Sequence, residues 1–146
     1  MALTEKEARA LIEELKRCAE KKIEFPSVGQ KQEFYTYSMD NRHQYTIHIY
    51  RGKINRLKYN ISARLYSDVL LELHVNPSNR HLNPDGSLIT SSHWHIYSEK
   101  YGLKEALEVD LKAENFVNNT IRFLKKFHVV YSELPSIIYQ NDINDT

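Results

Sequence analysis

Residues 73–102 read LHVNPSNRHLNPDGSLITSSHWHIYSEKYG, and the rest of the chain is organised around this segment. The tetrapeptide NPDG at residues 83–86 is a strong turn signal, because proline presets φ and glycine adopts a positive φ at no steric cost. The alternation of HWHIY at residues 93–97 predicts a strand after the turn. The segment therefore predicts a hairpin-like return of the chain.

Four of the seven histidines lie in this segment: His74, His81, His93 and His95. Residues two apart in a strand point the same way, so we expect His93 and His95 to share one face. The hairpin-like return predicts that His74 and His81 lie over that face. The alternative is that all four are ordinary polar residues of a solvated loop and a half-buried strand.

Imidazole is the commonest metal ligand in proteins. Three or four imidazoles favour Zn²⁺ over Mg²⁺ and Ca²⁺, which prefer oxygen ligands. We therefore predict a zinc site formed by these four histidines, with Asp85 or Glu99 as substitute ligands. Four protein ligands close the coordination sphere of zinc, which favours a structural ion over a catalytic one.

The composition is that of an ordinary globular protein, with 41% hydrophobic and 27% charged residues in a chain of 146, a length typical of one domain. The net charge of +1 argues against a general nucleic-acid or membrane binder. The single cysteine, Cys18, excludes an intrachain disulfide framework and fits a reducing compartment. No stretch resembles a signal peptide or reaches the roughly 20 apolar residues of a membrane span, so we expect a cytoplasmic protein.

Hydrophobic periodicity predicts an α+β fold, with an antiparallel sheet of five to six strands flanked by an N-terminal and a C-terminal helix. The first helix should begin at the capping box of Thr4 and Glu7 and end near Lys21, and the last should cover residues 115–127. Residues 1–131 are expected to form a single domain, followed by a polar, partly ordered tail at residues 132–146. The expected strands are residues 34–39, 45–50, 56–66, 69–75, 93–97 and 106–111.

Residues 42–67 carry six Lys or Arg and no acidic residue, with tyrosines interleaved. The pattern is typical of a surface for single-stranded nucleic acid, of a protein interface, or of a solvated outer sheet face. The near-zero net charge of the chain favours a protein partner over a phosphate backbone. The candidate partner-binding residues are Arg51, Lys53, Arg56, Lys58, Tyr59 and Arg64.

The pattern HxNPDG from His81, followed by HxHIYxExYG from His93, resembles the core signature of a small family of unknown function in bacteria and phages. In size and in its presumed metal site, the chain also resembles phage-encoded anti-CRISPR proteins that inhibit type II-A Cas9. This resemblance implies a non-enzymatic inhibitor with a structural zinc ion. We therefore expect direct contact with Cas9 in the bacterial host cytoplasm, and the near-zero net charge predicts no stable binding of free nucleic acid.

The alternative function is a metal- or histidine-dependent nuclease or toxin of a mobile element. Its general acid–base set would comprise His93, His95, Tyr97 and Glu99, with His81 and Asp85 as a further base and its orienting group. The chain has no Gly-rich phosphate loop, no nucleophile elbow and no HExxH helix. The sequence therefore favours a protein without enzymatic activity.

Overall fold

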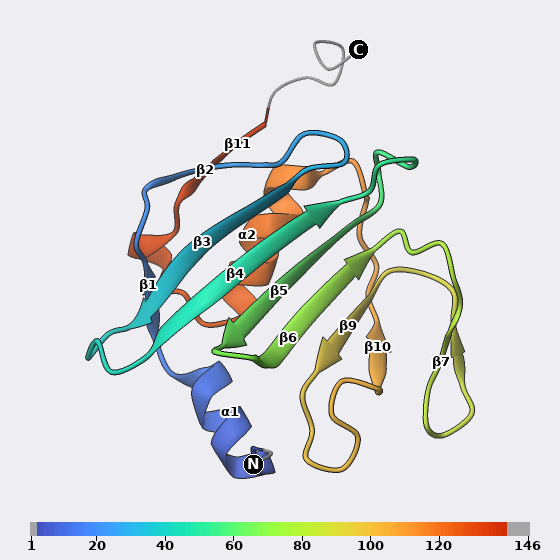
Figure 1. The fold of residues 1–146 in the computed structure, drawn as a ribbon, viewed down its shortest axis with the longest axis horizontal. Helices are drawn as coiled ribbons and strands as arrows, with labels where there is room; N and C mark the ends of the chain where they lie inside the picture. Colours follow the sequence, from blue (N-terminus) through green and yellow to red (C-terminus); the bar gives the residue numbers. More distant parts are fainter. Residues whose placement is uncertain (1–2, 140–146) are drawn as a thin grey trace.

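The structure, a computed structural model, describes residues 3–139 and is built on one antiparallel sheet of seven strands (Figure 1). The expected α+β fold is confirmed, and the sheet has one strand more than the upper expected number. The extra strand is an edge strand that follows the first helix. In spatial order the strands are β1 (Lys16–Cys18), β3 (Lys31–Ser38), β4 (Gln44–Arg51), β5 (Tyr59–Leu65), β6 (Asp68–Val75), β9 (His93–Ile96) and β10 (Ala106–Glu108).

The first helix, α1 (Glu5–Glu13), begins at the expected capping box, in which Thr4 and Glu7 each bond to the other's backbone N–H. Its end differs from the expectation, because the helix stops at Glu13 instead of continuing to Lys21. The next residue, Glu14, is extended, with φ −63° and ψ 143°. The prediction of helix beyond Glu13 is therefore wrong, and Lys16–Cys18 form the edge strand β1 instead.

A buried lysine joins the ends of the two helices. The side chain of Lys16 is fully buried, and its Nζ donates to the carbonyl oxygens of Ile12 (2.9 Å), Glu14 (2.8 Å) and Phe127 (2.9 Å). The last carbonyls of a helix have no intrahelical donor, and the helix dipole favours a cation beside them. Burial lowers the pKa of Lys16 to about 7. Lys16 thus satisfies carbonyls at the C-terminal ends of both helices.

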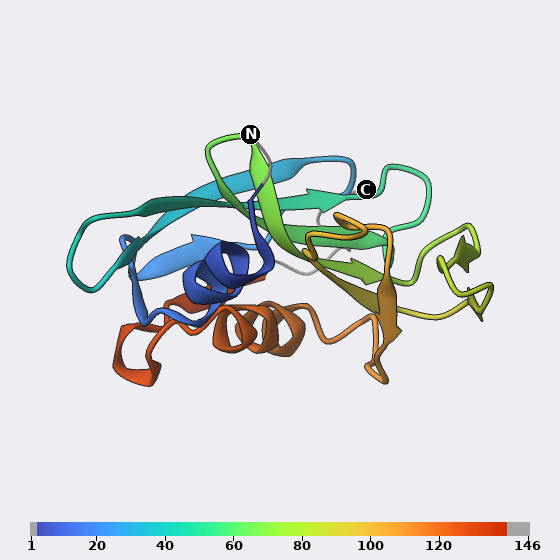
Figure 2. The same cartoon turned by 90° about the horizontal axis from the view of Figure 1, so that it is seen from below.

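The second helix, α2 (Phe116–Lys126), lies where the sequence predicts it, and both helices cover the same side of the sheet (Figure 2). The strand residues beneath them are apolar and fully buried, because alternate residues of a strand point to opposite faces. One row crosses four neighbouring strands in register and consists of Phe34, Ile47, Ala63 and Leu71. The other face of the sheet carries polar side chains and no helix within the described residues.

Short elements complete the described chain. β2 (Lys22–Glu24) pairs in parallel with β11 (Ser136–Ile138), which follows the 3-10 helix η1 (Tyr131–Glu133). The expected C-terminal tail therefore contributes a strand, and its residues 140–146 lie outside the described residues. β7 (His81–Leu82) and β8 (Leu88–Ile89) form a separate small hairpin, which we call the arm. None of the described helices is long and apolar enough to cross a membrane.

Candidate metal centre

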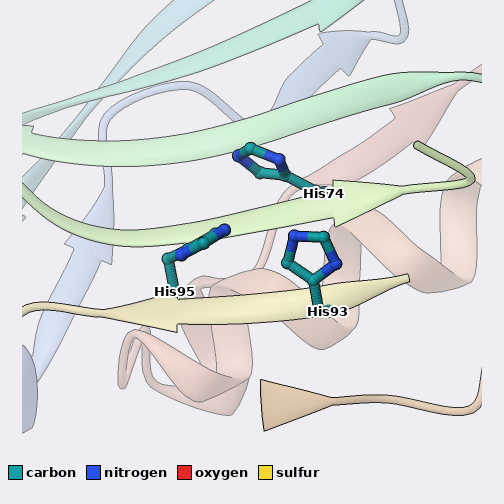
Figure 3. A group of neighbouring side chains, drawn as sticks. All are labelled: His74, His93 and His95. Atoms are coloured by element: carbon teal, nitrogen blue, oxygen red, sulfur yellow. The ribbon is translucent and has the colours of Figure 1, made fainter. Parts of the chain in front are cut away.

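Three histidines meet on the polar face of the sheet, where β6 pairs with β9. His74 and His93 are direct register partners, and His95 lies two residues further along β9 on the same face. Figure 3 shows the rings of His93 and His95 directed from β9 toward the ring of His74. Their possible ligand nitrogens all lie within 4.8 Å of one another, so the three lie close enough together to hold a metal ion.

The fourth histidine, His81, reaches the same place from the arm. Its ring centroid lies 4.8 Å from that of His95 and 5.5 Å from that of His93. His93 and His95 are buried, with 2% and 5% of their surface exposed, whereas His74 and His81 are half-buried. The structure therefore brings all four predicted histidines together, with His93 and His95 on the buried side of the cluster and His74 and His81 on its more exposed side.

Backbone carbonyls orient three of these rings. His93 Nδ1 lies 2.9 Å from the Ser91 carbonyl oxygen, and His95 Nδ1 lies 2.5 Å from that of Leu103. His81 Nε2 lies 2.6 Å from the Lys104 carbonyl oxygen. A carbonyl oxygen only accepts, so each of these ring nitrogens carries the proton and the other nitrogen of the ring has an available lone pair. This is the arrangement that fixes the tautomer of histidine ligands in metal sites.

Burial favours the neutral form of the His93 and His95 rings. Desolvation, together with the neighbouring rings, lowers the pKa of His95 to about 4 and also lowers the pKa of His93. Neutral imidazole is the form that binds a metal ion, so at neutral pH these two rings need not lose a proton before binding.

A carboxylate that the sequence reasoning missed stands beside the cluster. Glu72 is the register partner of His95, and its Oε1 lies 3.5 Å from His74 Nε2. Burial alone would raise the pKa of Glu72, but His74, His95 and Arg64 together hold it below its usual value. The signal was present in the sequence, because Glu72 and His74 are two residues apart in an expected strand and therefore share a face.

The profile of one protein family matches residues 3–129, a range that includes both helices, the whole seven-stranded sheet and all four histidines. The chain belongs to the family of unknown function DUF6978. This agrees with the expected resemblance to a family of unknown function. No curated protein and no solved structure matches the chain.

The NPDG turn at residues 83–86, which lies between the two strands of the arm, has a structural role. Asn83 is buried, its Nδ2 donates to the Ala106 carbonyl oxygen (3.0 Å), and its Oδ1 accepts from the Ala106 N–H (2.8 Å). The side chain thus pairs with β10 as a neighbouring strand would. Gly86 has a φ of +91°, and its N–H closes the turn on the Asn83 carbonyl oxygen (2.9 Å). Asn83 therefore helps to hold the arm against the sheet, together with the contact of His81 Nε2 with the Lys104 carbonyl oxygen.

The substitute ligands expected from the sequence have other partners. Asp85 accepts hydrogen bonds from the N–H (2.9 Å) and hydroxyl (2.6 Å) of Ser87, within the exposed turn. Glu99 accepts from the backbone N–H of Glu5 (2.9 Å) at the start of α1. The described structure therefore places neither carboxylate in the histidine cluster.

The expected acid–base set is not assembled either. The Tyr97 hydroxyl donates to the Leu3 carbonyl oxygen (2.7 Å), on the side of α1, and Glu99 is bonded to the same helix. Of that set, only His93 and His95 lie together.

The candidate partner-binding residues do not form one surface. Arg51 and Tyr59 are buried, so neither side chain is available for a surface contact. Arg51 donates to the carbonyl oxygens of Pro26 (3.1 Å) and Arg56 (2.9 Å). Lys53, Arg56 and Lys58 lie in and beside the β4–β5 loop, whereas Arg64 lies near the opposite end of β5. Basic composition alone could not separate these positions, because alternate residues of a strand face opposite ways.

Proposed function

We propose that this protein is a non-enzymatic, zinc-binding protein in which the ion fastens the arm to the sheet. The ligands are His74, His81, His93 and His95. The observation that supports it most directly is that three of these rings use one nitrogen on a backbone carbonyl and keep the other available. A buried ring N–H needs an acceptor in any case, but these bonds also turn the second nitrogen of each ring toward the cluster, which is how metal-site histidines are oriented.

The donor set fits zinc. Zn–N bonds of about 2.0–2.1 Å in a tetrahedron place ligand nitrogens about 3.4 Å apart. The ligand atoms of His74, His93 and His95 lie within 4.8 Å of one another, so the nitrogens need to approach by at most about 1.4 Å, which small side-chain rotations can supply. Four nitrogen ligands fill the tetrahedron and leave no position for a reactive water, which supports a structural ion.

Metal analysis of the purified full-length chain tests this proposal. We expect one zinc ion per chain and a lower melting temperature after chelation. His93→Ala combined with His95→Ala should abolish zinc binding, whereas His43→Ala, at the distant β3–β4 turn, should retain it. The proposal would be refuted if the purified protein contained no stoichiometric metal and its melting temperature did not change when a chelator was added. A variant that stays stable while losing a hydrolytic activity would instead favour a catalytic metal.

Inhibition of a type II-A Cas9 effector through direct protein contact remains the prediction for the partner, and it rests on the resemblance alone. Its test is co-elution with purified Cas9 alongside a gel shift with DNA and RNA. Co-elution without a gel shift is expected. Tight, salt-sensitive binding or cleavage of nucleic acid, without a Cas9 complex, would reject the inhibitor in favour of the nuclease.

A further inference from the structure

Three loops meet at one end of the sheet, at the upper right of Figure 1, where β4 ends and β5 begins. The three loops are residues 25–30, 52–58 and 76–80. The N–H of Gly29 donates to the Gly52 carbonyl oxygen (3.1 Å), and Lys58 Nζ donates to the Ser78 hydroxyl oxygen (3.0 Å). Hydrogen bonds therefore join the middle loop to each of its neighbours, and we call the surface that the three loops form the loop end.

The middle loop, between β4 and β5, is held in shape from within. The N–H of Gly52 donates to the Lys58 carbonyl oxygen (2.7 Å), and the buried side chain of Arg51 donates to the Arg56 carbonyl oxygen (2.9 Å). A Cβ atom at Gly52 would lie 2.8 Å from the Asn55 carbonyl oxygen, so the chain turns this tightly only because a glycine is there. The tip of the loop is thus preorganised, and little ordering has to be done when it binds.

The apolar residue at this tip faces solvent. Ile54 is 101% exposed, the highest value among the large hydrophobic residues of the described chain. Single exposed apolar side chains are common, but Ile54 stands between the exposed cations Lys53 and Arg56 on a preorganised loop. An aliphatic side chain flanked by long cationic ones can enter the boundary between lipid headgroups and acyl chains while the cations stay at the headgroups.

The loop end is positively charged through its own side chains. Residues 25–32, 44–67 and 73–84 contain no acidic residue. Four exposed cations and one half-buried cation lie in or beside the three loops: Lys31, Lys53, Arg56, Arg80 and Lys58. The net charge of the whole chain is only +1, because the acidic residues lie elsewhere in the sequence. The whole-chain value therefore understates the attraction of this end for an anionic surface.

The acidic residues nearest to this end in space belong to other layers of the molecule. Glu108, Asp110 and Glu114 line a hollow beside Asn76, on the connection from β10 to α2. This connection runs on the helix side of the sheet (Figure 2), where its Ala113 carbonyl oxygen accepts from the Tyr59 hydroxyl (2.9 Å). The protruding loop between β4 and β5 can therefore face an anionic surface with these carboxylates turned away from it.

We propose that the loop end binds the surface of an anionic phospholipid membrane, with Ile54 inserted at the headgroup boundary and the cations on the lipid phosphates. A fluid lipid surface adapts to a protruding loop, whereas a folded acidic protein needs a recess shaped for Ile54. A nucleic-acid backbone attracts the cations but offers no apolar medium for that side chain. The association is peripheral, since no described helix crosses a membrane, and it does not depend on zinc.

Co-sedimentation of the full-length protein with lipid vesicles tests the proposal. We expect binding to vesicles of phosphatidylserine and phosphatidylcholine in equal amounts, weaker at high salt, and little binding to phosphatidylcholine alone. A cation near an anionic surface contributes about fivefold to the partition coefficient, so Lys53→Gln combined with Arg80→Gln should weaken binding about 25-fold. The matched control, Lys6→Gln combined with Arg42→Gln, removes the same two charges from exposed positions on α1 and the β3–β4 turn and should bind nearly as the wild type does.

Ile54→Asn tests the insertion separately from the charge. It should weaken vesicle binding about fivefold or more, because apolar burial is lost, and leave the melting temperature unchanged, because the side chain is fully exposed. Three results would overturn the proposal: no preference for the anionic vesicles, equal weakening in the two double variants, or wild-type binding by Ile54→Asn. Binding of poly-glutamate or DNA by a protein that ignores the anionic vesicles would likewise overturn it, and would assign the loop end to an acidic polymer.

Discussion

Asn83→Ala should release the arm from the sheet without touching any proposed metal ligand. The substitution removes the two hydrogen bonds to Ala106 and a third, from Nδ2 to the Ser87 hydroxyl (3.2 Å). Ala106 is only 3% exposed, so its N–H and carbonyl groups would be left buried without their partner. Each such group costs about 1–3 kcal/mol, so the two together predict a local destabilisation of about 2–6 kcal/mol.

The consequence for the metal centre follows from the position of His81 on the arm. When the arm detaches, His81 leaves the cluster, while His74, His93 and His95 stay on the paired strands β6 and β9. Loss of an outer support of a metal ligand typically lowers metal affinity by about 10- to 100-fold. We expect a fall of this size in the zinc affinity of Asn83→Ala, together with little change in global unfolding, because the arm lies outside the main sheet.

Two measurements check this reasoning. Hydrogen exchange should accelerate in peptides covering residues 81–90 and 103–108, and competition with a chelator should report the weaker zinc binding. Asn118→Ala is the matched control, since Asn118 is exposed on α2 and far along the chain from the arm. Wild-type zinc affinity combined with wild-type exchange at Ala106 in Asn83→Ala would refute the role of Asn83 as the support of the arm.

Three further predictions concern stability. Lys16→Met removes the side-chain donor to the carbonyls of Glu14 and Phe127, whereas the Ile12 carbonyl keeps its contact with His128 Nδ1 (2.9 Å). The variant should lower the free energy of unfolding in urea by about 2 kcal/mol or more, and the exposed Lys22→Met should be nearly neutral. Burial and the neighbouring rings lower the pKa of His95 to about 4, so between pH 6.5 and 4 only the unfolded chain takes up a proton on this residue. The free energy of unfolding of the metal-free protein should therefore fall by up to about 3 kcal/mol as the pH falls through this window. A flat stability profile, or an unchanged slope in His95→Asn, would contradict this prediction. Arg51→Gln should lower the free energy of unfolding by about 2 kcal/mol, because the Arg51 side chain is buried and donates to backbone carbonyls. Lys53→Gln, at an exposed position of the β4–β5 loop, should leave it almost unchanged. Similar melting curves for the two variants would contradict this structural role of Arg51.

Local patterns in the sequence decided much of the fold. The capping box at Thr4, the apolar stripe of α2 and the alternation in β3 to β6 act between residues close in the chain, so they can be recognised without knowing the partners. The end of α1 could not be recognised in this way. The carbonyl of Phe127 that helps to hold Lys16 lies 111 residues away, so helix periodicity alone continued the helix too far.

For the candidate site, the sequence by itself determined that His93 and His95 share a face, because the period of a strand is two residues. Only the tertiary structure decided that β9 pairs with β6 with His93 opposite His74, that Asn83 docks the arm on β10, and that Arg51 turns inward. Each of these depends on which strand lies beside which, and on the register between them. Register is set by packing across the whole sheet, and a shift of one residue would send every one of these side chains to the opposite face.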